Sequence, residues 1–290
     1  MKQLLKYLLV FPASLLITAA KAQPLSLGIP SGHTAEIDQA AISSNSRFTI
    51  TSSKKDQSVR VWETFTGKLI FTTRLNTAPT HVSFDPAAKH FLITTADSVM
   101  LFSNEDGRRM FAIDAGSHAA FSADGRFIYA SDPFARYDLS GKLVEIIRDT
   151  RVDGIIQSSN GKYIAATVTD WGKDTLLIYG DHHQTPLHAI NEDLEEGLGN
   201  DDYCKSFMFS PDGNFFYYKS TPDATLKVIE TATGRQLLQF RDQYDVHADF
   251  HPAGRFISVV DDNVVKTFDL RSGRVVRIIP SKAIDGSESI

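Results

Sequence analysis

The stretch that decides the fold is KDQSVRVWETFTGK, residues 55–68. Asp56 precedes Trp62 by six residues across an alternating apolar run, and Gly67 ends a turn before a second apolar run begins at Leu69. Alternating β-branched and aromatic residues, bounded by Asp and Gly, are typical of two antiparallel strands joined by a turn. The stretch therefore predicts a β-hairpin.

This hairpin is the second half of a four-strand pattern that recurs six times with different residues. The first half of each copy has an apolar run, a short turn with Gly or another small residue, and a second apolar run. The second half is a further strand pair, as in 98–113 and 225–240. The last residue of the first turn marks the copies: Ser46, Ala88, Gly125, Gly161, Gly213 and Gly254. These markers are 42, 37, 36, 52 and 41 residues apart, so the repeat has a period of about 40 residues.

Four strands per unit of that length is the signature of a propeller blade. We therefore predict an all-β chain, a β-propeller of about six four-stranded antiparallel blades, or seven if one blade is incomplete. No long window has the 3.6-residue periodicity of a helix. A four-stranded sheet cannot bury both faces alone, whereas radial stacking covers them. The inner-strand residues Phe84, Phe121, Phe209 and Phe250 are expected to pack where neighbouring blades meet.

The repeats predict the domain boundaries. The propeller is expected over 23–281 and a polar tail over 282–290, with the repeats at 35–73, 77–114, 116–149, 151–191, 203–242 and 244–281. Residues 24–31 have the pattern of an outermost strand, yet 274–280 give the sixth repeat an outer strand of its own. Either one of these strands is redundant, or a seventh blade is expected after Ser281.

Residues 1–22 have the pattern of a secretory signal peptide. Lys2 and Lys6 precede an apolar run over 7–20, and Ala-Lys-Ala at 20–22 is a small-x-small cleavage site. An uncleaved anchor is the alternative, but the run is short for a membrane span. We expect cleavage, no stable membrane anchor afterwards, and a soluble exported protein that is periplasmic or secreted from a bacterial envelope.

Composition and charge narrow the classes of partner. The 290 residues are 42% apolar and 22% charged, which is an ordinary globular composition. Removing Lys2, Lys6 and Lys21 with the leader, and no acid, takes the formal charge from -5 to -8. An acidic domain argues against nucleic acid as a partner. Cys204 is the single cysteine, so the fold cannot depend on an internal disulfide.

The first repeat resembles a WD repeat. It has a Gly32-His33 pair before its inner strand and the Asp56 to Trp62 spacing. The resemblance implies a propeller that binds proteins. It also implies a hydrogen-bonded structural set within the blade: His33, Ser52 or Ser53, Asp56 and Trp62. The other repeats depart from the motif, since Asp223 and Asp262 keep the spacing but lead to Ile229 and Phe268.

An acidic segment accounts for the long fourth spacing. NEDLEEGLGNDDY, residues 191–203, joins two repeats on the same rim as His33 and contains Glu192, Asp193, Glu195, Glu196, Asp201 and Asp202. A calcium loop would have acids at alternating positions, which this segment lacks. We therefore interpret it as a solvated loop that presents charge to a partner. Together with Lys54 and Lys55 it forms the predicted partner-binding rim.

The residues at the starts of the inner strands form a second candidate set, a ring in the central channel. They are Asp38, His81, His118, Asp153, Lys205 and His247, one from each repeat. Such a ring suits a metal-dependent propeller hydrolase or lactonase, and equally an inert water-filled channel. His182 and His183 are adjacent in a turn, but no Cys or third His is near enough in sequence to complete a zinc site. We expect no metal and no cofactor.

No catalytic motif occurs in the chain: it has no Gly-x-Ser-x-Gly, no Gly-rich phosphate loop and no His-Glu-x-x-His. The sequence therefore favours a non-catalytic exported scaffold that binds a protein or peptide through its rim or channel mouth. Two alternatives stay open. One is the recognition propeller of a larger exported protein with a downstream hydrolase or peptidase domain, and the other is the channel hydrolase. The sequence leaves the oligomeric state open.

Overall fold

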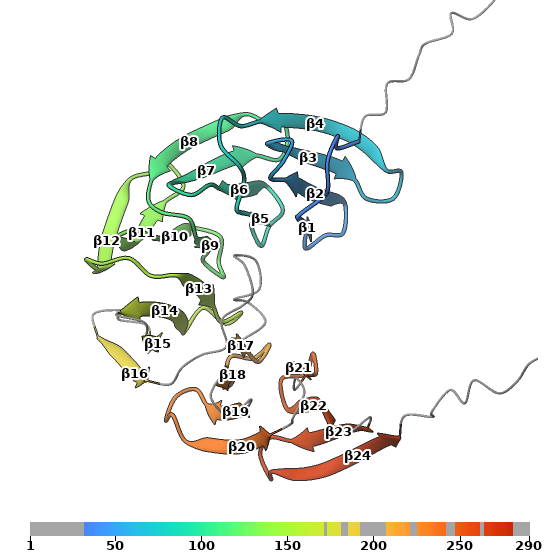
Figure 1. Ribbon diagram of the computed structural model, residues 1–290, viewed down its shortest axis with the longest axis vertical. Coiled ribbons are helices and arrows are strands. Elements are labelled where there is room, and N and C mark those ends of the chain that lie inside the picture. Colours follow the sequence, from blue (N-terminus) through green and yellow to red (C-terminus); the bar gives the residue numbers. More distant parts are fainter. Residues whose placement is uncertain are drawn as a thin grey trace, which may run out of the picture. The chain divides into compact units, whose positions relative to one another are not determined.

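The computed structural model describes residues 32–170, 173–180, 185–191, 207–220, 225–241, 247–261 and 264–280. The chain divides into two units, Met1–Gly32 and His33–Ile290, and all described strands belong to the second. They form six four-stranded antiparallel sheets (Figure 1), which confirms the predicted all-β propeller of about six blades. Among the described residues, no helix is long and apolar enough to cross a membrane.

The first three blades contain β1 to β12. Blade one has β1 (Gln39–Ile42), β2 (Phe48–Ser53), β3 (Ser58–Glu63) and β4 (Lys68–Arg74). Blade two has β5 (His81–Phe84), β6 (His90–Thr94), β7 (Ser98–Ser103) and β8 (Arg109–Asp114). Blade three has β9 (Ala119–Phe121), β10 (Phe127–Ser131), β11 (Phe134–Asp138) and β12 (Leu143–Arg148).

The last three blades contain β13 to β24. Blade four has β13 (Gly154–Gln157), β14 (Ile164–Asp170), β15 (Lys173–Tyr179) and β16 (Pro186–Ile190). Blade five has β17 (Phe207–Phe209), β18 (Phe215–Ser220), β19 (Thr225–Glu230) and β20 (Gln236–Arg241). Blade six has β21 (His247–Phe250), β22 (Phe256–Asp261), β23 (Val264–Asp269) and β24 (Arg274–Pro280).

In every blade the strands pair in chain order, each antiparallel to the next. The first and third turns of a blade therefore lie at one end of its sheet, and the second turn lies at the other end together with the connection from the preceding blade. We call the end with the first and third turns the turn face, and the other end the connection face. β24 is the outer strand of blade six, so the sixth repeat does supply its own outer strand. Residues 24–31 lie outside the described part.

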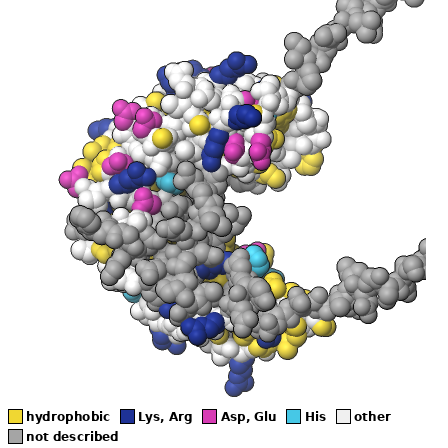
Figure 2. Space-filling model, viewed as in Figure 1, with side chains coloured by type: hydrophobic (Ala, Val, Ile, Leu, Met, Phe, Trp, Pro, Cys, Tyr) yellow, Lys and Arg dark blue, Asp and Glu magenta, His cyan; other side chains and the backbone are white. Residues whose placement is uncertain are grey.

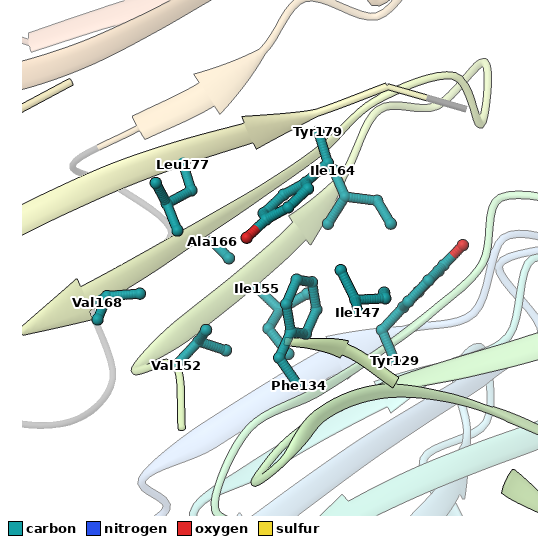
Figure 3. Packing of buried hydrophobic residues seen from close by; sticks show 10 residues of the cluster. All are labelled: Tyr129, Phe134, Ile147, Val152, Ile155, Ile164, Ala166, Val168, Leu177 and Tyr179. Carbon is teal, nitrogen blue, oxygen red and sulfur yellow. The ribbon is translucent and has the colours of Figure 1, made fainter. Parts of the chain in front are cut away.

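The core lies between blades. Among the described residues, five hydrophobic clusters join successive blades from one to six. Between blades three and four, Tyr129 and Phe134 face Ile164 and Tyr179 (Figure 3), and the rings of Phe134 and Tyr179 meet edge to face with centroids 5.7 Å apart. Because side chains alternate across a strand, the second strand of each blade from two to five packs on the preceding blade with one face and on the following blade with the other.

The four predicted phenylalanines lie in these clusters. Phe84, Phe121, Phe209 and Phe250 each belong to, or pack against, the cluster shared with the preceding blade. That placement confirms the prediction for the inner strands. The equivalent residue of blade one is Ile42, which is 63% exposed. It is exposed because no cluster of the described residues precedes blade one.

The first turns of blades one, three, four and five share a hydrogen-bond pattern. In blade three, Ser122 Oγ donates to Asp124 Oδ1 at 2.6 Å, and Phe127 N donates to Ser122 Oγ at 2.9 Å. The turn closes with Gly125 at φ 69°, and the marker residues of the other five blades also have positive φ. Neighbouring turns touch: Asn160 Nδ2 of blade four donates to the carbonyl of Asp212 in blade five at 2.6 Å. The turns thus help to hold successive blades together.

The face of blade six that points away from blade five differs from the corresponding faces of the other blades. At positions where blade five has Tyr217 and Val228, both buried, blade six has Ser258 and Thr267, whose hydroxyls lie 3.0 Å apart. Every residue of β24 is exposed. Figure 2 shows hydrophobic side chains gathered over this strand. Within the described residues, no hydrophobic cluster joins blade six to blade one.

Candidate interaction surfaces

The set predicted from the WD resemblance lies at the connection face of blade one. His33 Nδ1 lies 2.9 Å from Asp56 Oδ2, and His33 Nε2 lies 2.8 Å from Thr51 Oγ1. Trp62 Nε1 donates to the same Thr51 hydroxyl at 2.8 Å. These distances suit one chain of donors, from the Trp62 indole to Thr51, from Thr51 to His33, and from His33 to the Asp56 carboxylate. The His33 and Asp56 side chains are 2% and 8% exposed, so the chain is buried.

The hydroxyl in this set is that of Thr51, and the prediction of Ser52 or Ser53 was wrong. β2 pairs with β3 so that Thr49 lies opposite Trp62. Because successive side chains point to opposite faces, Thr51 shares the Trp62 face and Ser52 does not. The Ser52 hydroxyl is buried without a hydrogen-bond partner in the described part of the chain. Thr51 can be identified from the strand register, which the spacing of the motif does not reveal.

Asp56 is the acceptor that ends this chain. Burial alone would raise the pKa of its carboxyl, but hydrogen bonds from Ser58, His33 and the Thr34 amide together lower the pKa below 3.8. Ser58 Oγ donates to Oδ1 at 2.7 Å and Thr34 N to Oδ2 at 3.1 Å. Each group of the set is held by another group of the same blade, so the set is structural.

The predicted partner-binding rim is described only in part. Lys54 and Lys55 lie in the turn between β2 and β3, and Lys54 N donates to Asp38 Oδ2 at 2.5 Å. The acidic members at 192–202 lie outside the described residues. The structure therefore joins one rim residue to one residue of the predicted channel ring.

The predicted channel ring makes local contacts in its own blades. Asp38 and Asp153 have equivalent roles, since Asp153 Oδ2 accepts from Thr169 N at 3.0 Å as Asp38 accepts from Lys54 N. His118 Nδ1 lies 3.0 Å from Ser117 Oγ. His81 and His247 begin β5 and β21, and Lys205 lies outside the described residues. Nowhere in the described ranges do three His, Cys, Asp or Glu side chains lie close enough together to hold a metal ion.

A larger feature, which the sequence analysis missed, is a groove along the inner strands of blades one to four. It has a volume of about 590 Å³ and is lined by residues of β1, β5, β9 and β13 and of the turns that follow them. Its apolar lining includes Ile42, Phe84 and Phe121, and its polar lining includes Ser83 and Gln157. The Ser83 hydroxyl is buried and has no partner in the described part of the chain. The groove combines an apolar wall with polar side chains, of which Gln157 already hydrogen-bonds within the protein.

A second cavity, of about 480 Å³, lies between blades three and four on the turn face. Blade three has polar side chains here, at positions that are apolar in blade two. Arg136 Nη2 lies 3.0 Å from Glu145 Oε2, and the Arg136 guanidinium lies 4.7 Å from the centre of the Phe127 ring. Burial raises the pKa of Tyr129, which also lines this cavity. These polar side chains stand where apolar side chains would otherwise pack and fill the space.

Comparison with known proteins places the fold. The family model of the WD domain, G-beta repeat, matches residues 25–63. The chain is 24% identical over 254 residues to eukaryotic translation initiation factor 3 subunit I of Mycosarcoma maydis, which covers 86% of this chain and 67% of that protein. It also resembles the crystal structure of the Cps50 (Swd1) β-propeller domain of Myceliophteria thermophila. That match has a TM-score of 0.59 and 12% identity, and it covers 87% of this chain and 88% of the other.

These similar proteins are a translation-factor subunit and a β-propeller domain. The prediction of a non-enzymatic chain agrees with them. The match to the repeat model covers the His33 to Trp62 set, and the six antiparallel sheets account for the rest of the described chain. Residues 25–63 therefore match a WD repeat, and the described chain has the fold of a WD-repeat β-propeller, a fold that typically serves as a protein-interaction scaffold.

Proposed function

We propose that this protein is an exported, non-catalytic scaffold that holds an extended segment of a partner protein in the groove of blades one to four. The observation that supports the proposal is the groove itself, at about 590 Å³, on a family fold that commonly binds proteins. Export is supported by the leader pattern of residues 1–22.

The lining of the groove suits a peptide better than a small polar metabolite. Ile42, Phe84 and Phe121 offer apolar surface to aliphatic or aromatic side chains. Ser159, which is exposed and lines the groove, offers a hydroxyl that can hydrogen-bond to an extended peptide backbone. Binding pockets in proteins typically combine a mostly apolar lining with a few polar groups in this way, at volumes of about 300–1,000 Å³.

The base of the groove is rigid, which favours recognition without rearrangement. The side chain of Gln157 accepts from Ala123 N and donates to Gly161 O at 3.3 Å, so it links blades three and four. Phe84 and Phe121 are backed by the hydrophobic clusters between blades. A rigid scaffold loses little conformational entropy when a partner binds.

Site-specific photo-cross-linking in cells tests the proposal. A photoreactive residue at Ile42, which is 63% exposed in the groove, should yield a discrete protein adduct. The matched control is Ile146, 49% exposed in the outer strand β12 of blade three and outside the groove, which should yield none. The variant Phe121→Asp, introduced beside the Ile42 label, should abolish the adduct. Equal adducts from both positions, or no adduct from Ile42, would contradict the proposal.

Export is tested separately by fractionating the cells. An envelope or secreted band that lacks 22 residues supports it, because the leader pattern ends at Ala22. A full-length band confined to the cytoplasm would contradict export without affecting the groove. A band much larger than the 32.1 kDa chain would instead point to the propeller of a longer protein.

A further inference from the structure

Charge is sorted between the two ends of the blades. On the turn face, eight basic side chains are exposed and pair with no carboxylate of the described residues. They are Arg47, Lys68, Lys89, Arg109, Lys142, Lys162, Arg271 and Arg274. They recur because a basic residue follows the marker of the first turn in five of the six blades, and because a basic residue also follows the third turn in most of them. The repeat therefore distributes positive charge over the whole turn face.

Most carboxylates of the turn face accept hydrogen bonds from groups in their own turns. Asp138 Oδ1 accepts from Ser140 Oγ at 2.6 Å and from Lys142 N at 3.1 Å. Burial alone would raise the pKa of Asp124, but hydrogen bonds from Ser122 and Arg126 and the charge of Arg126 lower it to about 2. Among the described acids of this face, Glu105 is the one whose carboxylate makes no such contact. The basic side chains listed above thus remain available to a partner.

The connection face has the opposite balance. Its exposed acids in the described part are Glu36, Asp38, Asp97, Asp114, Asp132 and Asp149. Its exposed basic residues are fewer: Lys55, Arg74, Arg151 and Arg241, and Arg151 Nε lies 3.4 Å from Asp153 Oδ1. The whole chain has a formal charge of -5, so the positive turn face is not a consequence of overall composition.

A cavity on the turn face offers a place for a carboxylate. It lies between blades five and six, has a volume of about 370 Å³, and is lined by three arginines, Arg235, Arg255 and Arg271, and by two carboxylates, Asp212 and Glu230. Arg255 Nη2 is bonded to Asp269 Oδ2 at 2.5 Å, and Arg235 Nε lies 3.6 Å from Glu230 Oε2. Arg271 is exposed and pairs with no described carboxylate. A guanidinium group binds a carboxylate through two parallel hydrogen bonds.

We propose that the turn face binds an acidic segment of a partner protein, one rich in Asp and Glu, with Arg271 as an anchor. A peptide presents separate carboxylates that can meet the basic side chains blade by blade. A nucleic acid presents an unbroken row of phosphates, which would also meet the turn carboxylates of Asp106, Asp138 and Glu230. The first turns of blades one to four border both this surface and the groove, but Lys142 and Arg271 line no part of the groove, so variants at these two positions test the proposal independently of the proposed function.

Fluorescence anisotropy with labelled decaglutamate tests the proposal, with decalysine and a short DNA duplex as comparison ligands. Decaglutamate should bind the full chain, and more weakly at high ionic strength. Lys142→Glu with Arg271→Glu should weaken binding at least about fivefold per charge at low salt, the factor for a unit-charge contact at about 4 Å in water. The matched control, Arg74→Glu with Arg151→Glu, changes the net charge equally on the connection face and should stay within about twofold of wild type. Circular dichroism and thermal unfolding check that both variants fold.

Four results would overturn the proposal. They are no binding of decaglutamate at low salt, equal loss in the control variant, binding of the duplex as tight as that of decaglutamate, and a salt-sensitive self-association that the turn-face variant abolishes. The last would assign the surface to a second copy of this chain. An adduct at Ile42 that survives in the turn-face variant would leave the groove function intact.

Discussion

The replacement Thr51→Val tests how blade one is held together. Valine has the shape of threonine but no hydroxyl, so the change removes one oxygen atom that serves two donors or acceptors. His33 Nε2 and Trp62 Nε1 both lie 2.8 Å from Thr51 Oγ1 and would lose this partner together. The β2 backbone and its register should not change.

The expected cost follows from burial. The His33 side chain is 2% exposed, so its Nε2 would be left without a partner away from water. A buried polar group that loses its partner costs about 1–3 kcal/mol. Trp62 is half-buried, and its indole N–H can regain water at a smaller cost. Together these terms give about 2–3 kcal/mol of lost unfolding free energy.

Urea unfolding, followed by tryptophan fluorescence and circular dichroism, measures the loss. The neighbouring variant Ser52→Ala is the matched control, because the Ser52 hydroxyl is buried with no partner in the described residues and its removal should be neutral or slightly stabilising. Thr51→Ser keeps the hydroxyl and should recover most of the stability. A neutral Thr51→Val beside a destabilising Ser52→Ala would refute the assignment of Thr51 and favour the original motif reading.

Three further outcomes are expected. Asp56→Asn should be less stable than wild type near neutral pH. Because the folded-state pKa of Asp56 is lowered, the difference in unfolding free energy should shrink as the pH falls below 3.8 through that pKa. Urea titrations at several pH values would show this, and a difference that grows in acid would contradict it. Gly213→Ala should cost more than Gly67→Ala in thermal unfolding. Both residues have positive φ, worth about 1–2 kcal/mol of strain for alanine, but a Cβ at Gly213 would lie 2.4 Å from Asn160 Nδ2 while one at Gly67 meets nothing within 4 Å. Phe134→Ala should cost about 3–5 kcal/mol, since the side chain is fully buried between blades three and four, whereas Phe65→Ala, at 86% exposed, should change the unfolding free energy by no more than about 0.5 kcal/mol.

The repeat architecture was predictable from sequence because it depends on local signals. Turn residues such as Gly125 and Gly213 and the period-two apolar runs between them specify strands and their order, and both are properties of short windows. The inner-strand phenylalanines were placed correctly for the same reason. A bulky apolar residue at an equivalent position in several repeats must meet an equivalent surface in each.

The surfaces were less predictable because they depend on register and on neighbouring blades. Ser52 and Thr51 are both plausible hydroxyl donors in the motif, and the pairing of Thr49 with Trp62 is what separates them. The sequence predicted a channel ring from the residues at the starts of the inner strands, yet Asp38 and Asp153 accept hydrogen bonds from backbone amides of their own blades. The sorting of charge between the two ends appears only when turns from distant repeats are brought to one face.

The unequal survival of the WD motif has an energetic explanation. Blade one keeps the hydrogen-bonded set, whereas the other five repeats lack its histidine and tryptophan, and every blade still keeps the positive-φ residue at its first turn. Removing the Thr51 hydroxyl from the set costs one blade about 2–3 kcal/mol. An interface between blades buries several large side chains, such as Phe91, Ile93 and Phe102, at about 1.5–3 kcal/mol each. A blade can therefore lose the set and remain folded while its neighbours cover it. Blade one has no hydrophobic cluster before it within the described residues, and it is the blade that retains the set.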